Sequence, residues 1–247
     1  MCNPTAGYFP GKTARAGENI TLTSRDGNDF TVRISRPEGE PPYPTVLIIH
    51  DYFDPEHYYF DLADQYASAG FLGVCPDLFH RHSKLPEQTH DEAGKRIPLV
   101  GDEEVFDDVD VTLDYLSNEG LLGGLALTGF CWGGRMAYLV AARHPEAKLL
   151  IPFYGHLTAW GGNKPYSPLE EAGKIKARVI GFYGGGDPSI PLEDVTKMEQ
   201  RLKDNGLDAE LNVVDGAPHC FFMTREWARA SDDSWARVLA ASRETIT

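Results

Sequence analysis

Cysteine is scarce in this 247-residue sequence, and long apolar runs are absent. The four cysteines (Cys2, Cys75, Cys131 and Cys220) are widely spaced and form no CxxC pair, which predicts reduced thiols rather than a disulfide framework or a zinc cluster. No stretch of about 18 consecutive apolar residues occurs, so we expect no segment that spans a bilayer. The first residues lack a basic region followed by an apolar one, so we expect no secretory signal and a cytoplasmic location.

Basic residues are fewer than acidic ones. Lysine and arginine together number 23, aspartate and glutamate 37, and the formal net charge is −14 at pH 7. A surface this negative disfavours nucleic acid and anionic membranes as partners. The hydrophobic and charged fractions, 42% and 24%, are ordinary for a packed globular protein and argue against disorder. No repeat or long linker divides the chain, so we predict one domain over residues 1–247.

Two kinds of apolar pattern predict the fold class. Residues 20–23 and 30–34 alternate apolar with polar around Asp26-Gly27, which predicts a β-hairpin. Unbroken apolar runs, typical of parallel strands covered on both faces, follow at 46–49, 71–75, 125–130, 149–154, 179–183 and 211–214. Helical patterns lie at 58–69, 105–116, 135–143, 192–205 and 226–242. Together they predict an α/β fold: a mostly parallel, twisted sheet with helices on both faces and reactive residues at the carboxyl ends of its strands.

A reactive residue type stands directly after the third unbroken apolar run. The segment Gly129-Phe130-Cys131-Trp132-Gly133 has the pattern G-x-C-x-G between a predicted strand and a predicted helix, which is a nucleophile elbow with sulfur in place of oxygen. The glycines are needed because a tight turn leaves no room for a Cβ on either side. We predict Cys131 as a nucleophile at a helix N-terminus that favours a thiolate, with the Trp132 N–H as an oxyanion donor. The alternative is a buried cysteine in a glycine-rich turn.

An elbow of this kind requires an acid and a histidine further along the chain. Asp187 follows the predicted strand at 179–183, and His219 follows the strand that ends at Val214. We predict His219 as the base that takes the thiol proton and Asp187 as the residue that holds its ring in the right tautomer. Asp215 is the second-choice acid. Taken singly, Asp187 can equally be a helix cap and His219 a loop histidine, but their combination favours a triad.

A second loop of interest follows the first unbroken apolar run. The backbone N–H of Tyr52 lies where a second oxyanion donor is expected, and we expect the carboxylate of Asp51 to point toward the thiol of Cys131. Trp132 and Phe221 adjoin the motifs, so we expect them to wall an apolar pocket beside the thiol.

Three further features of the sequence have both a functional and a purely structural interpretation. The segment 80–82 (HRH) suggests a metal site, but its two rings point to opposite sides of an extended chain, so we predict no metal. Arg135, in the first turn after the elbow, can hold a thiolate or form an ion pair with a neighbouring acid, and both interpretations stay open. Cys220 adjoins His219, and we expect its side chain to point away from that histidine.

Taken together, these residues resemble the dienelactone hydrolase family, the cysteine-dependent, carboxymethylenebutenolidase-like branch of the α/β-hydrolases. The similarity runs in family order from about residue 18 to the C-terminus. It is carried by segments at 48–53 (IIHDYF), 75–81 (CPDLFHR), 129–135 (GFCWGGR), 153–155 (FYG), 184–187 (GGGD) and 218–221 (PHCF). The resemblance implies an α/β-hydrolase fold, and we expect no cofactor.

The resemblance also implies a mechanism and roles for single residues. The predicted triad would open an ester or lactone through a thioester-linked acyl-enzyme. Asp51 stands where the family has a glutamate that contacts the resting cysteine, and Arg81 matches an arginine that binds a substrate carboxylate. Another family arginine is replaced here by Met223, which makes a less anionic ester, lactone or acyl compound an expected substrate.

Two classes of function fit these residues. The first is a hydrolase of small esters or lactones, and acyl transfer to an acceptor other than water would use the same residues. The second is a redox- or electrophile-sensing protein on a hydrolase scaffold, whose Cys131 reacts without turnover. For either one we expect a small-molecule partner, neither nucleic acid nor membrane, and a monomer or small homo-oligomer.

Overall fold

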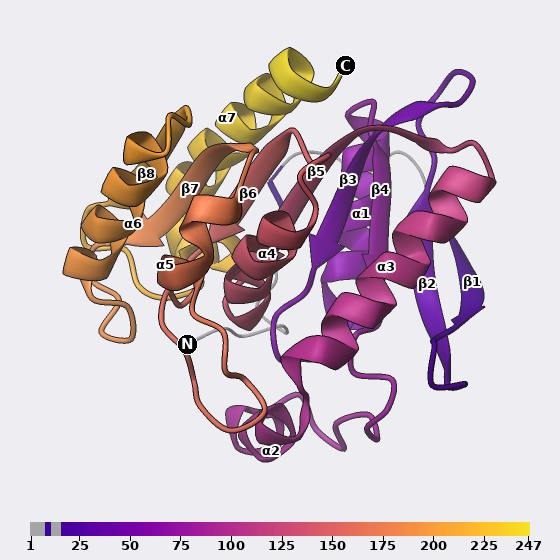
Figure 1. The fold of residues 1–247 in the computed structure, drawn as a ribbon, viewed down its shortest axis with the longest axis horizontal. Helices are drawn as coiled ribbons and strands as arrows, with labels where there is room; N and C mark the ends of the chain where they lie inside the picture. Colours follow the sequence, from indigo (N-terminus) through magenta and orange to yellow (C-terminus); the bar gives the residue numbers. More distant parts are fainter. Residues whose placement is uncertain (1–7, 11–15) are drawn as a thin grey trace.

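One eight-stranded mixed sheet organises the chain (Figure 1). The computed structural model describes residues 8–10 and 16–247, and the strands follow the order β1-β2-β4-β3-β5-β6-β7-β8 across the sheet. The strands are β1 Glu18–Thr23, β2 Asp29–Ser35, β3 Tyr43–Ile49, β4 Leu72–Pro76, β5 Leu122–Phe130, β6 Leu149–Phe153, β7 Arg178–Gly184 and β8 Ala209–Val214. The α-helices are α1 Tyr59–Ser68, α2 His90–Arg96, α3 Asp102–Asn118, α4 Trp132–Arg143, α5 Pro168–Glu171, α6 Leu192–Asp204 and α7 Ala228–Ile246. Short 3-10 turns are η2 Pro55–His57, η3 Ile97–Leu99, η4 Ala172–Lys174, η5 Phe221–Met223 and η6 Arg225–Trp227.

The predicted N-terminal hairpin is confirmed. β1 and β2 pair antiparallel, with Leu22 opposite Phe30. Gly27 makes the turn between them at φ 87°, a left-handed conformation that glycine adopts without steric cost. β2 then pairs antiparallel with β4, which attaches the hairpin to the edge of the main sheet.

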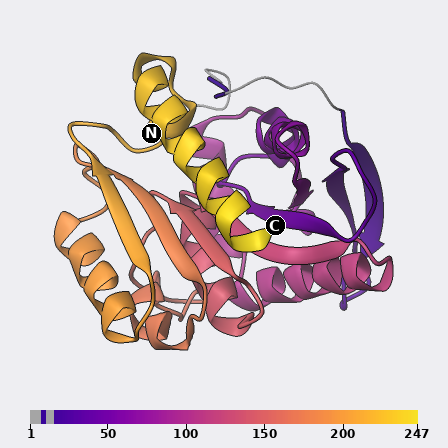
Figure 2. The ribbon, with the colours of Figure 1, turned by 90° about the horizontal axis from the view of Figure 1, so that it is seen from above.

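All six unbroken apolar runs form strands, and β3 to β8 are joined by parallel pairing. Their side chains are buried on both faces because helices cover both: α1 and α7 lie on one side of the sheet, and α3, α4 and α6 on the other (Figure 2). β8 is one of the two edge strands, and four of its six residues are partly or fully exposed. The predicted mostly parallel α/β sheet is therefore confirmed.

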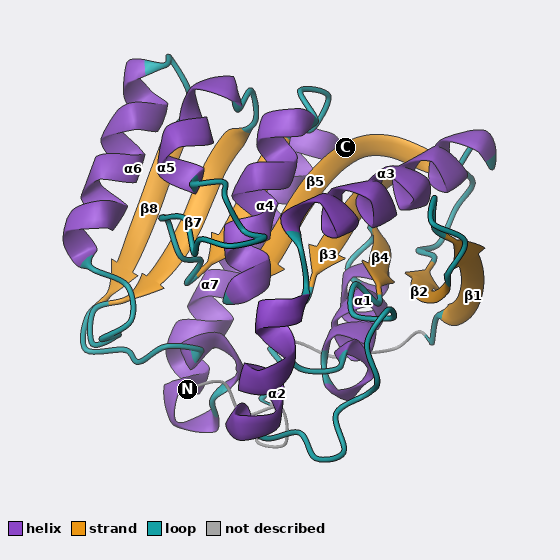
Figure 3. Cartoon of the chain, turned by 60° about the horizontal axis from the view of Figure 1, so that its bottom comes forward, coloured by secondary structure: helices purple, strands orange, loops and turns teal. Residues whose placement is uncertain are grey.

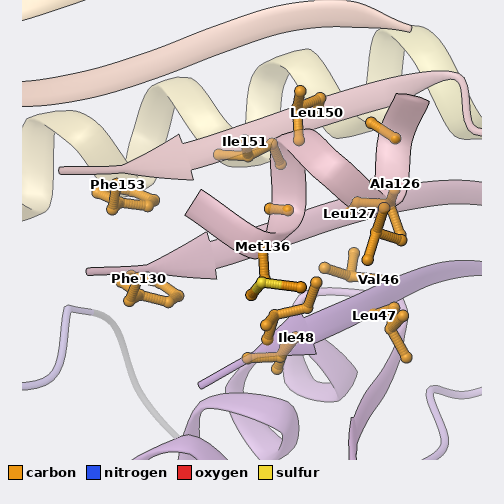
Figure 4. Packing of buried hydrophobic residues seen from close by; sticks show 14 of the residues in the cluster. Val46, Leu47, Ile48, Ala126, Leu127, Phe130, Met136, Leu150, Ile151 and Phe153 are labelled. Atoms are coloured by element: carbon orange, nitrogen blue, oxygen red, sulfur yellow. The ribbon is translucent and has the colours of Figure 1, made fainter. Parts of the chain in front are cut away.

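The core lies between the central strands and the helices that cover them (Figure 4). Val46 and Ile48 of β3, Leu127 of β5 and Met136 of α4 are all fully buried. Burying such apolar surface contributes about 25 cal/mol per Å² to stability. Because the elbow leads from β5 directly into α4, this packing fixes both arms of the turn at Cys131.

The five predicted helices correspond to α1, α3, α4, α6 and α7, with bounds shifted by a few residues. α2 and η3 were not predicted, because these short elements carry no apolar periodicity long enough to recognise. Figure 3 shows α2 beyond the end of the sheet to which the strand arrows point. Among the described residues, none of the helices combines the length and apolarity needed to cross a bilayer.

Candidate active site

Cys131 occupies the strained turn between β5 and α4. Its backbone angles are φ 57° and ψ −116°, a conformation that residues with side chains rarely adopt. A Cβ on Gly129 would lie 2.0 Å from the carbonyl oxygen of Gly133, and a Cβ on Gly133 would lie 2.2 Å from that of His50. The Cys131 N–H donates to the Phe153 carbonyl of β6 (3.0 Å). The backbone therefore has the geometry that the glycine pattern predicts for an elbow.

Asp187 and His219 are hydrogen-bonded to each other after β7 and β8. The distance between Asp187 Oδ2 and His219 Nδ1 is 2.5 Å. Ser189, which the sequence analysis missed, donates its backbone N–H (2.8 Å) and its hydroxyl (2.6 Å) to Asp187 Oδ1. Burial acts to raise the pKa of Asp187, but the bonds with His219 and Ser189 outweigh it and hold that pKa below its usual value. A serine two residues after an aspartate is typical of a local side-chain turn, the signal that could have found Ser189.

Three side chains converge at the elbow. The sulfur atoms of Cys131 and Cys220 and a ring nitrogen of His219 lie within 4.8 Å of one another. The expectation that Cys220 points away from His219 is wrong, because Cys220 adopts a left-handed backbone at φ 59° and the alternation of an extended chain does not apply there. Cys75 and Cys131 are free, whereas Cys220 is disulfide-bonded. The prediction of reduced thiols is therefore wrong for Cys220, and Cys2 lies outside the described residues.

This cluster is the one group in the described part of the chain that could hold a metal ion. Its donor set fits a metal poorly, since the Cys220 sulfur is in a disulfide and His219 Nδ1 is engaged by Asp187; zinc prefers free thiolate and neutral imidazole ligands. In the segment 80–82, His80 Nε2 is bonded to Asp108 Oδ2 (3.0 Å). The absence of a metal stays a prediction from the chemistry of these donors.

Asp51 is a buried acid whose charge acts on the thiol of Cys131. Its side chain accepts the Phe53 N–H at Oδ1 (2.9 Å), and its Oδ2 has no hydrogen-bond partner among the described residues. Burial raises the pKa of Asp51 to about 7. Burial and the charge of Asp51 also raise the pKa of the Cys131 thiol, while the Trp132 N–H acts to lower it. A thiol is therefore favoured at rest rather than the expected thiolate, because burial and a neighbouring carboxyl outweigh the helix N-terminus.

The loop that follows β3 is held by hydrogen bonds on both sides of Tyr52. The fully buried His50 accepts the Leu78 N–H at Nε2 (3.1 Å), so its Nδ1 donates to the Asp51 carbonyl (2.7 Å). Burial lowers the pKa of His50 to about 3, which keeps its ring neutral. Arg96 donates to the Tyr52 carbonyl (3.0 Å). The peptide groups around Tyr52 are thus held in place, as preorganised oxyanion donors must be.

A cavity of about 300 Å³ opens above the elbow. Its lining brings together Cys131, Asp187 and His219 with Tyr52, Ile97, Trp132, His156, Trp160, Pro188, Ser189 and Pro218. The rings of His156 and Trp160 are 5.1 Å apart, and both residues come from the loop after β6, which carries no motif that would single them out. Burial lowers the pKa of His156 to about 4. At pH 7 this histidine is therefore neutral.

Two residues expected to contact substrate do not join the cavity. The Arg81 guanidinium donates to Asp108 (2.6 and 3.0 Å) and to Asp26 (2.6 Å), and it is not among the described residues that line the cavity. Phe221 is fully buried in the core. Trp132 does line the cavity, as expected for a wall residue.

Arg135 forms an ion pair with an acid, which is one of the two roles that the sequence leaves open for it. Its guanidinium donates to both carboxylate oxygens of Asp102 (2.7 and 2.8 Å) and to the Tyr166 carbonyl (2.7 Å). The pair joins the first turn of α4 to the first residue of α3, so Arg135 supports the elbow from outside the cavity.

Comparison with known proteins gives consistent matches over most of the chain. The model of the "Dienelactone hydrolase family" matches residues 30–245. A "Putative carboxymethylenebutenolidase" of Yersinia pestis is 32% identical over 230 residues, covering 89% of this chain and 85% of the relative. A protein of the same description from Escherichia coli (strain K12) is 32% identical, covering 89% and 84%. The crystal structure of a "Putative Dienelactone Hydrolase" from Klebsiella pneumoniae is 29% identical, with a TM-score of 0.84, and covers 93% of this chain and 99% of that one.

Proposed function

Because the chain belongs to the dienelactone hydrolase family, we propose that it hydrolyses small esters or lactones through a Cys131–His219–Asp187 triad and a thioester acyl-enzyme. One observation carries the proposal. A strained elbow presents Cys131 to a cavity, within 4.8 Å of a histidine whose Nδ1 is bonded to a buried aspartate. A nucleophile, a base and a residue that orients the base are the minimum set for covalent acyl transfer.

Acylation begins with a proton transfer from sulfur. His219 takes the thiol proton as the Cys131 sulfur attacks the carbonyl carbon, and a small rotation of the thiol closes the gap to the ring. The N–H groups of Trp132 and Tyr52 receive the carbonyl oxygen as it becomes an oxyanion. The bond to the leaving oxygen then breaks, His219 gives its proton to that oxygen, and the acyl group stays on Cys131 as a thioester.

Water completes the cycle by the reverse proton path. His219 takes a proton from water, the water oxygen attacks the thioester carbonyl, and the carbon–sulfur bond breaks to release the acid. The proton on His219 returns to the sulfur of Cys131. Asp187, whose pKa is held low by its hydrogen bonds, stabilises the charged ring of His219 in both steps.

Asp51 acts as a second proton acceptor near the thiol in this proposal. Its pKa of about 7 lets it gain or lose a proton near neutral pH, and its Oδ2 has no partner among the described residues. A base is most effective when its pKa lies near the working pH. The aspartate is one methylene shorter than the glutamate of the family, and it acts on Cys131 by its charge, which contributes to raising the pKa of the thiol.

The test is acyl-enzyme formation and turnover with an activated ester. Wild-type protein with excess p-nitrophenyl acetate is expected to turn over repeatedly, with an acetylated species visible by intact-mass spectrometry after acid quenching. Cys131→Ala is expected to lose the acetylated species and at least about 10³-fold in kcat/KM. Cys75→Ala is the matched control, because Cys75 is also free and buried but lies within β4.

Undiminished turnover by Cys131→Ala refutes the triad. Labelling of Cys131 at one equivalent without repeated turnover would instead support the sensing function, since only an enzyme regenerates its thiol.

We also propose a cytoplasmic location and a monomer or small homo-oligomer. The free thiol of Cys131 supports a reducing compartment, while the disulfide at Cys220 counts against one. Cell fractionation and size-exclusion chromatography with light scattering measure the two properties directly.

A further inference from the structure

Apolar side chains make up the walls of the cavity above the elbow. Ile97 of η3, Trp132 of α4 and Trp160 surround it together with Pro188 and Pro218. These residues offer a substrate apolar surface and ring faces. Such walls favour the apolar groups of a substrate, because these groups gain free energy when they leave water.

Polar groups in the cavity are neutral or already engaged. His156 is neutral at pH 7, because burial lowers its pKa to about 4. Asp187 is anionic and takes hydrogen bonds from His219 and Ser189. A carboxylate entering the cavity would meet this anion, and among the described residues that line the cavity there is no lysine or arginine to offset it.

Guanidinium groups near the carboxyl end of the sheet are occupied by buried acids. The pairs have N···O distances of 2.5 to 2.7 Å and are Arg81 with Asp108, Arg96 with Asp54 and Arg135 with Asp102. In each pair the acid is at least nine-tenths buried. Breaking a buried ion pair leaves an uncompensated charge and is strongly unfavourable, so these guanidinium groups are not available to a substrate.

Lys164 is a cation in a hollow next to the cavity. It lines a neighbouring hollow that shares Ile97 and Trp160 with the cavity, and its ammonium donates to Asn163 Oδ1 (3.2 Å). The residue is buried. Lys164 thus lines this hollow and is not among the described residues that line the cavity with the reacting sulfur.

Trp160 in the wall of the cavity is partly exposed. Its exposed fraction is 38%, so part of this apolar side chain is open to solvent and an apolar group of a substrate can cover it. The protein as a whole carries a net charge of −14, which slows the approach of an anion further.

From these contacts we infer that the site takes an uncharged ester or lactone with an apolar acyl group and discriminates against substrates that carry a carboxylate near the reacting carbonyl. This inference rests on the proposed hydrolase function, and it names the substrate class of the same cavity. The family-type arginine at position 81 does not serve as a carboxylate receptor here, because Asp108 and Asp26 already occupy it.

Matched esters test the inference by turnover. p-Nitrophenyl valerate and mono-p-nitrophenyl succinate share a leaving group and have acyl chains of similar length, but only the second is an anion. With Cys131→Ala as the background, wild type is expected to show at least about tenfold higher kcat/KM for the valerate. Trp160→Ala is expected to lower kcat/KM for the valerate more than for the succinate. Equal or greater kcat/KM for the succinate overturns the inference.

Matched alkylating agents test the same point without turnover. Iodoacetamide is neutral and iodoacetate is an anion, and both alkylate a thiolate. The ratio of their rates at Cys131 is expected to exceed the ratio measured for 2-mercaptoethanol by at least about tenfold. A failed ester assay with this elevated ratio refutes the hydrolase function alone, whereas a ratio equal to that of the free thiol refutes the charge selectivity.

Lys164→Gln decides whether the neighbouring hollow contributes. The variant is expected to leave both the ester preference and the alkylation ratio unchanged within about twofold. If it instead sharply reduces the reaction of the anionic ester or of iodoacetate, Lys164 is an anion receptor and the inference is wrong.

Discussion

Asp51 and Asp187 are both buried acids of the candidate site, and their surroundings move their pKa values in opposite directions. Asp187 takes three hydrogen bonds, one from His219 and two from Ser189, and its pKa is lowered. Asp51 takes the single Phe53 N–H among the bonds described, and burial raises its pKa to about 7. Pairs of acids separated in this way divide the work of a site between a permanent anion and a group that exchanges protons.

Asp51→Asn is expected to remove a pH dependence of stability. The folded pKa of Asp51, about 7, lies above its ordinary value of 3.8, so the folded state holds this proton more tightly than the unfolded state. The stability that this protonated carboxyl contributes is full below about pH 4 and is lost as the pH rises through about 7. The loss in the free energy of unfolding is up to about 4 kcal/mol. Urea unfolding of wild type and Asp51→Asn at about pH 4.5 and pH 8 measures this loss. Relative to wild type, the free energy of unfolding of the variant should be higher at about pH 8 than at about pH 4.5.

A control distinguishes this effect from the general titration of a protein rich in acids. Glu40 is exposed, so Glu40→Gln is expected to keep the pH dependence of wild type. If Asp51→Asn also keeps it, the carboxyl of Asp51 is ionised in the folded protein and cannot exchange protons with the thiol near neutral pH.

At the scale of elements, the elbow is the feature that local sequence specifies most completely. The apolar run of β5, the glycine spacing and the amphipathic α4 all predict the same turn, and the backbone of Cys131 adopts it. The constraint at Gly129 comes from the turn itself, whereas the constraint at Gly133 comes from the end of β3, which pairs with β5.

Gly133→Ala is expected to disrupt the elbow. Its added Cβ would lie 2.2 Å from the carbonyl oxygens of Ile49 and His50, which are backbone atoms at the end of β3 and cannot move aside cheaply. We expect a loss of about 3 kcal/mol or more in the free energy of unfolding, with loss of alkylation at Cys131. Chemical denaturation and an iodoacetamide assay measure the two effects.

Gly94→Ala serves as the matched control for that substitution. Gly94 lies in α2, and a Cβ there meets no atom within 4 Å. The change should stabilise the protein by about 0.5–1 kcal/mol, because alanine loses less entropy than glycine in a helix. Similar behaviour of the two variants would mean that the close approach at Gly133 does not constrain the turn.

Sequence patterns were less informative where the site depends on loops. His156 and Trp160 come from a segment after β6 without periodicity or motif, so their position beside His219 follows only from how that loop packs. Arg81 shows the reverse case. Its motif fixes the residue type, but its partners Asp108 and Asp26 come from α3 and from the hairpin turn, and no local pattern reveals that they lie opposite.

At the scale of the whole molecule, Arg81 joins three parts of the fold. It follows β4, and its guanidinium reaches Asp26 in the turn between β1 and β2 and Asp108 in α3. Asp108 is fully buried and is also bonded by His80. The arginine thus ties the antiparallel edge of the sheet to α3, and it is not among the described residues that line the cavity.

Arg81→Ala is therefore expected to act on stability rather than on substrate charge. Removing the guanidinium leaves Asp108 buried with His80 as its remaining described partner, a change of about 3 kcal/mol in the free energy of unfolding. Arg25→Ala removes ion pairs with Asp107 and Asp110, but all three side chains are about one-third or more exposed, so a change below about 1 kcal/mol is expected. Urea denaturation compares the two variants, and the ratio of kcat/KM for the valerate and succinate esters should stay at its wild-type value in both. A selective loss of the anionic ester in Arg81→Ala alone would return this arginine to substrate binding, because a purely structural tie has no means of sensing the charge of a substrate in a cavity it does not line.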